Sequence, residues 1–316
     1  MSKLSVLGGN ANPGLTAEIC QKLGIKQTEI FVGRFSEGEI RVHIRENIRG
    51  QDVFIVQPTC PPVNENLMEL LILIDAVRRA SADRITAVIP YYGYARQDRK
   101  DQPRVPITAK LVANLIVAAG ANRVLTMDLH AAQLQGFFDI PVDHLYAINV
   151  LSEYFKERKI GDLVVVSPDV GGIKMARAYA KRLNAGLAIV DKRRMSPEKT
   201  EVMHILGEVK GKNVVMIDDI IATAGSLVDA VQGLKSSGAN GIYAAASHGV
   251  LSGPAHERIT NCKELLEVVI TNSIPLKEGV QNPKIKQLSI APLMAEAIAR
   301  THNAESISSL FEEIRN

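Results

Sequence analysis

Residues 214–226, VVMIDDIIATAGS, place two adjacent aspartates, Asp218 and Asp219, directly after an apolar run. Like charges side by side repel, and burying either carboxylate is costly unless a partner neutralises it. The residues that follow are small or carry a hydroxyl group, so their backbone N–H groups can approach an anion. A ribose 5-phosphate fits both features, with its hydroxyls on the aspartates and its phosphate on residues 222–226. A solvated turn fits the same residues, and the pattern alone does not separate the two.

Three further stretches concentrate polar and charged side chains. GRFSEGEI (33–40) places an aromatic residue beside two glutamates, a pattern that a polar hairpin explains by itself. PYYGYARQDRKD (90–101) offers planar donor groups suited to a polyphosphate, or is a solvated loop. VDKRR (190–194) brings three successive cations to the end of a predicted strand. As a mobile clamp it would neutralise phosphoryl groups, and an exposed basic turn is the alternative.

Alternating apolar runs and amphipathic segments predict an α/β protein that positions these stretches. Nearly continuous apolar strands separated by helices indicate parallel sheets covered by helices on both faces. Ligands of such sheets bind at the carboxyl ends of the strands, where Asp218 and Asp219 stand. The expected strands are 4–7, 52–57, 84–89, 123–127, 163–167, 187–191, 214–217 and 241–247, and the expected helices include 64–79, 107–119, 172–184 and 227–236.

The β/α rhythm restarts after about residue 146, where HLYAINVLSEYF begins a new helix. We therefore expect two similar α/β domains, residues 1–146 and 147–316, with the last helices able to pack on the first domain. A chain of 316 residues is long enough for two such cores.

Composition narrows the class of protein. Hydrophobic residues make up 46% and charged residues 22% of the chain, and the net charge of +3 gives no argument for nucleic-acid binding. No apolar stretch approaches the roughly 20 residues of a membrane helix, and we expect no signal peptide. Cys20, Cys60 and Cys262 are isolated, which fits a reducing cytoplasm. We expect a cytoplasmic protein with neither a nucleic acid nor a membrane as partner.

In combination, these stretches resemble the ribose-phosphate diphosphokinases, also called phosphoribosyl pyrophosphate synthetases. TMDLHAAQLQGFFDIPVDHLYA (126–147) and SPDVGG (167–172) match the family as well, and the resemblance covers essentially the whole chain. It implies two type I phosphoribosyltransferase-like domains, the first for ATP binding and assembly. It also implies that O1 of ribose 5-phosphate attacks the β-phosphorus of Mg-ATP. The products are AMP and phosphoribosyl diphosphate, a precursor for nucleotide, histidine and tryptophan biosynthesis.

The resemblance also implies roles for single residues. Lys192 and Arg194 are the expected catalytic cations of the clamp. His130 and Asp169 are the expected Mg²⁺ residues, and because imidazole is an unusual ligand for a hard cation, His130 is expected to act partly through a metal-bound water. The expected ATP-binding residues are Phe35, Glu37, Gly38, Glu39, Arg96, Gln97 and Asp98, and the expected ribose 5-phosphate residues are Arg194, Asp218, Asp219, Ala222, Thr223, Ala224, Gly225 and Ser226.

A regulated hexamer built from dimers is implied too, with inorganic phosphate as activator and ADP as inhibitor at a site between subunits. This chain departs from the family pattern at Ala222, where a third aspartate is common, and at Gln102 and Pro103, where a lysine and a serine are common. Losing that lysine removes a cation, so we expect phosphate to activate at a higher concentration and ADP inhibition to be blunted. The residues implied for this site are Arg49, Arg104, Ser306 and Ser308.

Competing functions explain fewer of the motifs. A phosphoribosyltransferase that consumes phosphoribosyl diphosphate needs one such domain, and needs neither GRFSEGEI nor YARQDR. A non-catalytic regulator of the same fold would be expected to lose the VDKRR cations or the metal residues, which this chain keeps. A P-loop nucleotidase is excluded, because the sequence has no G-x-x-x-x-G-K-[ST] motif. The sequence therefore predicts a diphosphokinase.

Overall fold

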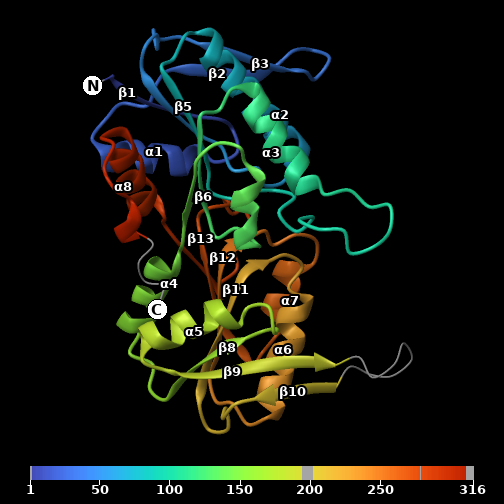
Figure 1. Cartoon of the computed structure of the whole chain (residues 1–316). Coiled ribbons are helices and arrows are strands. Elements are labelled where there is room, and N and C mark those ends of the chain that lie inside the picture. Colours follow the sequence, from blue (N-terminus) through green and yellow to red (C-terminus); the bar gives the residue numbers. More distant parts are fainter. Residues whose placement is uncertain (1, 194–201, 278, 311–316) are drawn as a thin grey trace. The chain divides into compact units, whose positions relative to one another are not determined.

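The computed structural model describes residues 2–193, 202–277 and 279–310, which form two compact units. Unit 1 contains residues 2–146, 273–275 and 289–310, and unit 2 contains the other described residues. Each unit has its own mostly parallel sheet with helices packed on it (Figure 1), which confirms the predicted α/β class. Among the helices of the described residues, none has the length and apolar character needed to cross a membrane.

The sheet of unit 1 is fully parallel, and its central strands are built from apolar side chains that are buried. Its strands follow the order β1 (Leu4–Gly8), β4 (Asp52–Val56), β5 (Arg84–Ile89), β6 (Arg123–Met127) and β7 (Val142–Leu145). The helical elements of this unit are α1 (Pro13–Leu23), α2 (Val63–Arg79), α3 (Thr108–Ala119), α8 (Ala291–His302) and the short η1 (Ala132–Phe137) and η2 (Ser308–Leu310).

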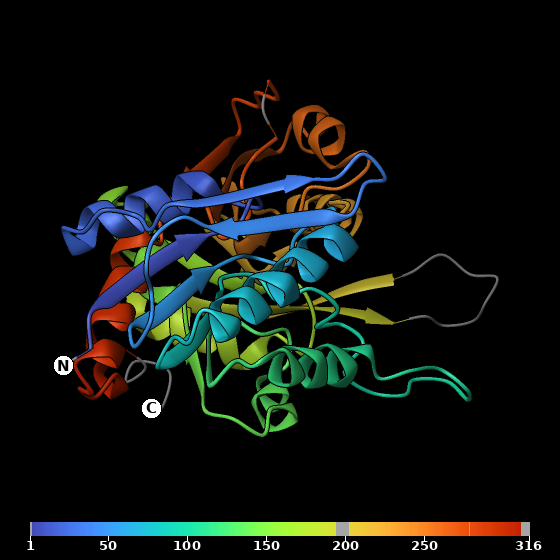
Figure 2. The ribbon, with the colours of Figure 1, turned by 90° about the horizontal axis from the view of Figure 1, so that it is seen from above.

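A separate antiparallel hairpin, β2 (Ile30–Arg34) and β3 (Ile40–Ile44), completes unit 1. Its apolar side chains alternate with polar ones, so the inner face packs on the core of the unit and the outer face is exposed. Figure 2 shows the two strands running alongside α2. The hairpin therefore lies on a helix rather than extending the main sheet.

The seven-stranded sheet of unit 2 is parallel except for its edge strand β10. Its order is β10 (Val202–Leu206), β9 (Gly186–Arg193), β8 (Leu163–Ser167), β11 (Asn213–Ile221), β12 (Ile242–Gly249), β13 (Leu265–Thr271) and β14 (Ile285–Leu288). The helices of this unit are α4 (Ile148–Glu157), α5 (Ile173–Leu183), α6 (Gly225–Ser236) and α7 (Ala255–Asn261).

Strands β9, β11 and β12 of unit 2 run further than the sequence predicts. Strand β11 continues to Ile221, so Asp218 and Asp219 lie within the strand, and the alternative of a solvated turn is wrong. Pairing with β12 explains the extension, because Asp218 stands opposite Ala246 and the pairing continues to the end of β11. Strand β9 runs to Arg193, where it pairs with β10. Tertiary pairing thus overrides the low strand propensity of aspartate.

Candidate active site

The two aspartates of β11 are held close together. Asp219 is 9% exposed, and its backbone N–H donates a hydrogen bond of 2.9 Å to Oδ1 of Asp218. Burial, together with the negative charges of Asp219 and Asp169, raises the pKa of Asp218 to about 8. The ligand-free pair therefore keeps a proton near neutral pH. A ligand that donates hydroxyl hydrogens or brings a cation would relieve the repulsion.

The loop after β11 leads directly into the first turn of α6. Ala224 precedes the helix in a left-handed conformation with φ of 58°, and no side chain caps the first turn. The first N–H groups of a helix lack partners within the helix and lie at its positive end. Thr223 and Ser226 are exposed beside them, so this loop combines amide and hydroxyl donors as a phosphate site requires.

Helix α7 holds this loop in place. Nη1 of Arg258 donates a hydrogen bond of 2.9 Å to the carbonyl oxygen of Thr223. A Cβ atom added at Gly225 would lie 3.2 Å from the same Nη1, so a side chain there would press on Arg258. Sequence analysis missed Arg258, because a lone arginine 35 residues from its partner leaves no local signal.

Asp169 follows β8 and contributes to the raised pKa of Asp218, so the electrostatic fields of the two carboxylates overlap. Its Oδ1 accepts the N–H of Gly172 at 2.8 Å, and the hydroxyl of Ser167 donates to its carbonyl oxygen at 2.7 Å. These bonds fix the orientation of an exposed carboxylate. A hard oxygen ligand of this kind suits Mg²⁺.

No group of three or more His, Cys, Asp or Glu side chains suited to a metal ion occurs within the described ranges. Mg²⁺ prefers six oxygen ligands and commonly takes most of them from water and substrate phosphates. The Asp169 carboxylate fits such a shared site. His130, the other predicted metal residue, follows β6 in unit 1 and is exposed.

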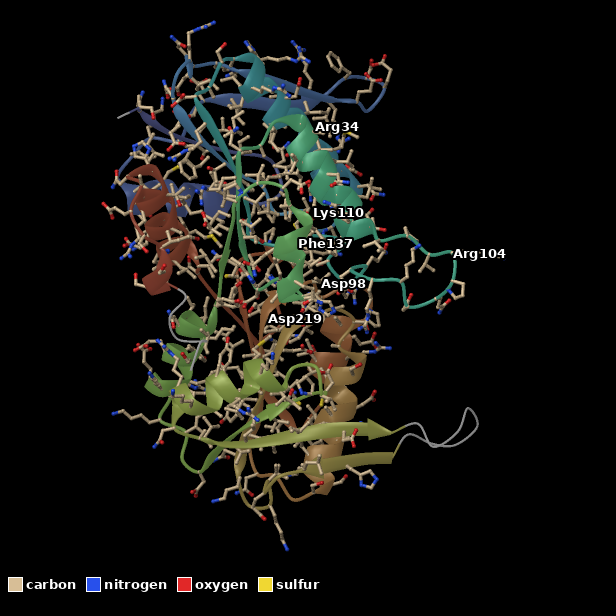
Figure 3. The ribbon with its side chains drawn as sticks, in the orientation of Figure 1. Arg34, Asp98, Arg104, Lys110, Phe137 and Asp219 are labelled. Atoms are coloured by element: carbon tan, nitrogen blue, oxygen red, sulfur yellow. The ribbon has the colours of Figure 1, made fainter. Side chains whose placement is uncertain are left out.

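The backbone beside His130 is supported by a second histidine. Nε2 of the buried His144, on β7, accepts the N–H of Leu129 at 2.9 Å, which requires this nitrogen to be unprotonated. Further along, Nζ of Lys110 donates to the carbonyl oxygen of Phe137 at 2.6 Å and anchors the end of η1. Figure 3 shows Lys110 and Phe137 facing each other across this contact. The sequence analysis assigned neither His144 nor Lys110.

The predicted adenine stretch 33–40 forms the tip of the β2–β3 hairpin, so the hairpin interpretation is confirmed. The N–H of Phe35 donates to Glu39 O at 2.9 Å, and the N–H of Gly38 donates to Phe35 O at 3.0 Å. Gly38 has φ of 92°, which glycine adopts without strain. This tight turn leaves the ring of Phe35 48% exposed, with Glu37 and Glu39 exposed beside it.

Arg34 anchors this tip to α2. Its Nη1 donates to Gly38 O at 2.9 Å, and its Nη2 forms an ion pair with Glu65. One planar guanidinium thus joins the turn to the helix below it, a geometry that a lysine does not reproduce. The hydroxyl of Ser36 donates to Glu37 at 2.7 Å, and this bond lowers the pKa of Glu37.

The predicted polyphosphate loop is anchored through Gln97. Its carbonyl oxygen accepts the N–H of Ala109 at 3.2 Å, and its side-chain oxygen accepts the hydroxyl of Thr108. Asp98 accepts a bond of 3.4 Å from Gln133, whereas Arg96 is exposed. Gln97, predicted as a donor to ATP, therefore also fixes the loop to the start of α3.

The chain matches known proteins along its whole length. A family model of the N-terminal domain of ribose phosphate pyrophosphokinase matches residues 4–120, and a model of the phosphoribosyl synthetase-associated domain matches residues 193–312. Ribose-phosphate pyrophosphokinase of Caldanaerobacter subterraneus subsp. tengcongensis is 58% identical over 311 residues, 98% of each chain. The chain belongs to the ribose-phosphate pyrophosphokinase family.

Two further members of the family are similar to this chain over nearly its whole length. The Bacillus caldolyticus ribose-phosphate pyrophosphokinase is 55% identical over 98% of each chain. The crystal structure of phosphoribosylpyrophosphate synthetase from Mycobacterium smegmatis superposes with a TM-score of 0.90 at 42% identity, covering 96% of this chain and 100% of that one. The fold of both units is therefore the fold of this family.

The predicted catalytic clamp is described in part. Lys192 lies near the end of β9, opposite Met203 of β10, and Arg194 lies outside the described residues. Lys192 and Arg193 thus lie in a strand that pairs with β10, rather than in an exposed turn that begins at Asp191. This pair extends beyond the helices of unit 2 (Figure 1).

Of the predicted regulatory residues, Arg104 lies apart from Ser306 and Ser308, which follow α8. Arg104 is exposed at the outer end of the loop before α3 (Figure 3), and Arg49 is exposed after β3. Ser306 and Ser308 follow α8 and share a hydrogen bond of 3.2 Å. Figures 1 and 2 show the loop and the end of α8 on opposite sides of the unit. One chain alone does not bring Arg104 to the serines.

Proposed function

We propose that this protein transfers the diphosphoryl group of Mg-ATP to O1 of ribose 5-phosphate, giving 5-phosphoribosyl 1-diphosphate and AMP. The observation that carries the proposal is the partly buried, proton-sharing pair Asp218 and Asp219 beside the uncapped start of α6. Vicinal hydroxyls fit the carboxylates and a 5-phosphate fits the helix start. Membership of the ribose-phosphate pyrophosphokinase family supports the same substrates.

In this mechanism each part of the chain has a separate task. Asp218 and Asp219 orient the ribose, while residues 222–226 hold its phosphate, so that O1 faces the β-phosphorus. The O1–P bond forms as the bond between the β-phosphorus and the α-phosphate oxygen breaks, and AMP leaves. Lys192 and Arg194 neutralise charge on the transferring group and on the leaving phosphate. Positioning and neutralisation are the main requirements of phosphoryl transfer.

Unit 1 supplies the nucleotide site in this proposal. Phe35 stacks on the adenine, Glu37, Gly38 and Glu39 face its polar edge, and Arg96, Gln97 and Asp98 lie along the phosphates. The exposure of the Phe35 ring and of Arg96 supports these roles. When bound, Mg²⁺ would neutralise part of the triphosphate charge, and Asp169 and His130 are the residues that would hold it.

The assembly and its regulation are part of the proposal. We infer a hexamer of identical chains, with phosphate as activator bound between subunits by Arg49, Arg104, Ser306 and Ser308. The separation of Arg104 from the two serines within one chain supports a site that needs two chains. The three cysteines are free and buried, which suits a reducing cytoplasm.

The test is a product analysis. The protein is mixed with ATP, ribose 5-phosphate, Mg²⁺ and inorganic phosphate, and the nucleotide and sugar products are separated. We expect AMP and phosphoribosyl diphosphate in equal amounts. Formation of ADP, or of AMP without the phosphorylated sugar, would contradict the proposed function. The variant Asp218→Asn serves as a control that keeps the shape of the side chain and removes its charge.

A further inference from the structure

The outer face of the β2–β3 hairpin carries a row of alternating aromatic rings and arginines. Phe31 and Phe35 are 38% and 48% exposed, although large aromatic side chains are usually buried. The guanidinium carbon of Arg41 lies 5.8 Å from the centroid of the Phe31 ring and 5.5 Å from that of Phe35. That of Arg45 lies 5.9 Å from Phe31. All three distances fall within the range of cation–π attraction.

Gly33 makes this arrangement possible. It stands opposite Arg41 in the strand pairing, and in the sequence it lies two residues after Phe31 and two before Phe35. A Cβ atom at position 33 would lie 2.6 Å from the Cζ atom of Phe31, so the ring already occupies the space a side chain would need. The missing side chain lets both rings approach the guanidinium that lies opposite the gap.

We propose that Arg41 is a positioning residue for the nucleotide, because it fixes the Phe35 ring as a platform for the adenine. This inference rests on the proposed function, in which Phe35 stacks on the base. Arg41 lies over one face of the ring, and the adenine takes the other face. Base stacking on an aromatic side chain needs a ring held in one orientation, and an exposed ring on a turn has rotamer freedom to lose on binding.

Arg34 and Arg41 contact different parts of the hairpin tip. Arg34 fixes the backbone of the turn through Gly38 O and the ion pair with Glu65. Arg41 contacts the ring itself, which those bonds leave free to rotate. Arg45, which directly follows β3, contacts Phe31 but forms its ion pair with Glu29 at 2.9 Å. Arg45 therefore provides a matched control.

The experiment compares steady-state kinetics of the full-length protein with those of Arg41→Leu, Arg41→Lys and Arg45→Leu. An exposed cation–π contact is worth about 2- to 5-fold in an equilibrium, so Arg41→Leu is expected to raise the KM for ATP by about that factor. Its kcat and its KM for ribose 5-phosphate stay within about 2-fold of the parent. Arg41→Lys keeps the charge without the plane and recovers less than half of the loss. Arg45→Leu leaves the KM for ATP unchanged.

A second measurement separates stacking from simple charge attraction. Inhibition by AMP, which carries the base, is compared with inhibition by tripolyphosphate, which does not. Arg41→Leu should weaken AMP and leave tripolyphosphate unchanged, and it should have no further effect in a Phe35→Ala background. Equal weakening of both inhibitors, or an unchanged KM for ATP, would overturn the role of Arg41. A parent protein that makes no AMP from ATP and ribose 5-phosphate would instead refute the proposed function.

Discussion

Buried acidic side chains at the carboxyl ends of the two sheets have different surroundings. In unit 1, Glu69 accepts hydrogen bonds from the N–H of Asn10 at 2.6 Å and from Gln57 at 2.9 Å, and its other oxygen accepts one from the Asn10 side chain at 3.0 Å. In unit 2, Asp218 stands beside a second carboxylate, and its pKa rises to about 8. Donors of the protein itself stabilise the Glu69 carboxylate, whereas burial and the neighbouring Asp219 oppose ionisation of Asp218.

This difference fits the different roles proposed for the two units, which share an α/β architecture. Glu69 joins the loop after β1 to Gln57 after β4, and Asn10 continues the network to the hairpin through Val32 O at 3.4 Å. The corresponding edge of unit 2 carries small residues and an uncapped helix start instead. A hydrogen-bonded network is rigid and supports neighbouring residues, whereas two adjacent carboxyl groups repel each other when both are ionised, and a bound ligand can relieve that repulsion.

The largest effect is expected from the predicted catalytic lysine of unit 2. Lys192→Ala is expected to lower kcat by on the order of 10²-fold or more with little change in KM, because its charge is needed as the phosphoryl group transfers. Lys212→Ala is the control, since Lys212 pairs with Asp162 at 3.5 Å at the start of β11. A kcat for Lys192→Ala within a few-fold of the parent would remove Lys192 from the catalytic residues.

Removing the hydrogen-bonded Glu69 carboxylate of unit 1 is expected to lower the stability of the protein rather than its catalytic rate. Glu69→Ala leaves the N–H of Asn10 and the amide of Gln57 without their acceptor, and we expect unfolding to become easier by about 2–4 kcal/mol. Urea unfolding followed by circular dichroism measures this. Asp75→Ala, on the same helix, removes an exposed ion pair with Arg79 and should cost less than about 0.5 kcal/mol. Equal effects of the two variants would contradict the comparison.

For the aspartate pair of unit 2 we expect a loss of substrate binding rather than of stability. Asp218→Asn replaces a carboxyl group that holds a proton near neutral pH in the ligand-free protein, so stability at pH 7 should change little. The KM for ribose 5-phosphate should rise by about tenfold or more, since a charge-assisted hydrogen bond to a sugar hydroxyl is lost. The KM for ATP should change little. An equal rise in both KM values would indicate metal binding or folding damage instead.

How much of this arrangement the sequence predicts depends on the range of the interactions. Runs such as LVVVS (163–167) and DVFIV (52–56) form the expected strands, because continuous apolar character suffices in a doubly covered sheet. The sequence predicts too early an end for β11, because only the pairing with β12 keeps the two aspartates extended. The return of α8 to unit 1 depends on its packing against α1, a contact that leaves no local pattern.

How well the site residues can be predicted also depends on the range of their interactions. Motifs that bind ligands are contiguous, so residues 33–40 and 218–226 stand out in the sequence. The residues that support them are distant in the chain: Glu65 pairs with Arg34, Arg258 bonds to Thr223, and His144 holds Leu129. Each supporting side chain is an ordinary residue on an ordinary helix or strand. Only the folded arrangement identifies its partner.

The raised pKa of Asp218 also makes a prediction about pH. A folded-state pKa of about 8, against an ordinary value of 3.8, means that the folded protein binds more protons than the unfolded chain between these values. The free energy of unfolding should therefore fall as pH rises from about 4 to about 8. Urea midpoints of the ligand-free protein at pH 5 and pH 8 measure this fall, and Asp218→Asn should flatten it. An unchanged slope in that variant would contradict the assignment.

The smallest effect is expected at the regulatory loop of unit 1, because it lies outside both substrate sites. Arg104 is exposed at the end of its loop, and the preceding Gln102 and Pro103 supply neither a cation nor, at the proline, an N–H. A charge-assisted hydrogen bond contributes about 1.5–3 kcal/mol, so Arg104→Ala should raise the phosphate concentration for half-maximal activation by about tenfold. The KM for ribose 5-phosphate at saturating phosphate should stay the same. Arg79→Ala, an exposed arginine of the same unit, is the control, and phosphate activation that is indifferent to Arg104→Ala would place the activator elsewhere.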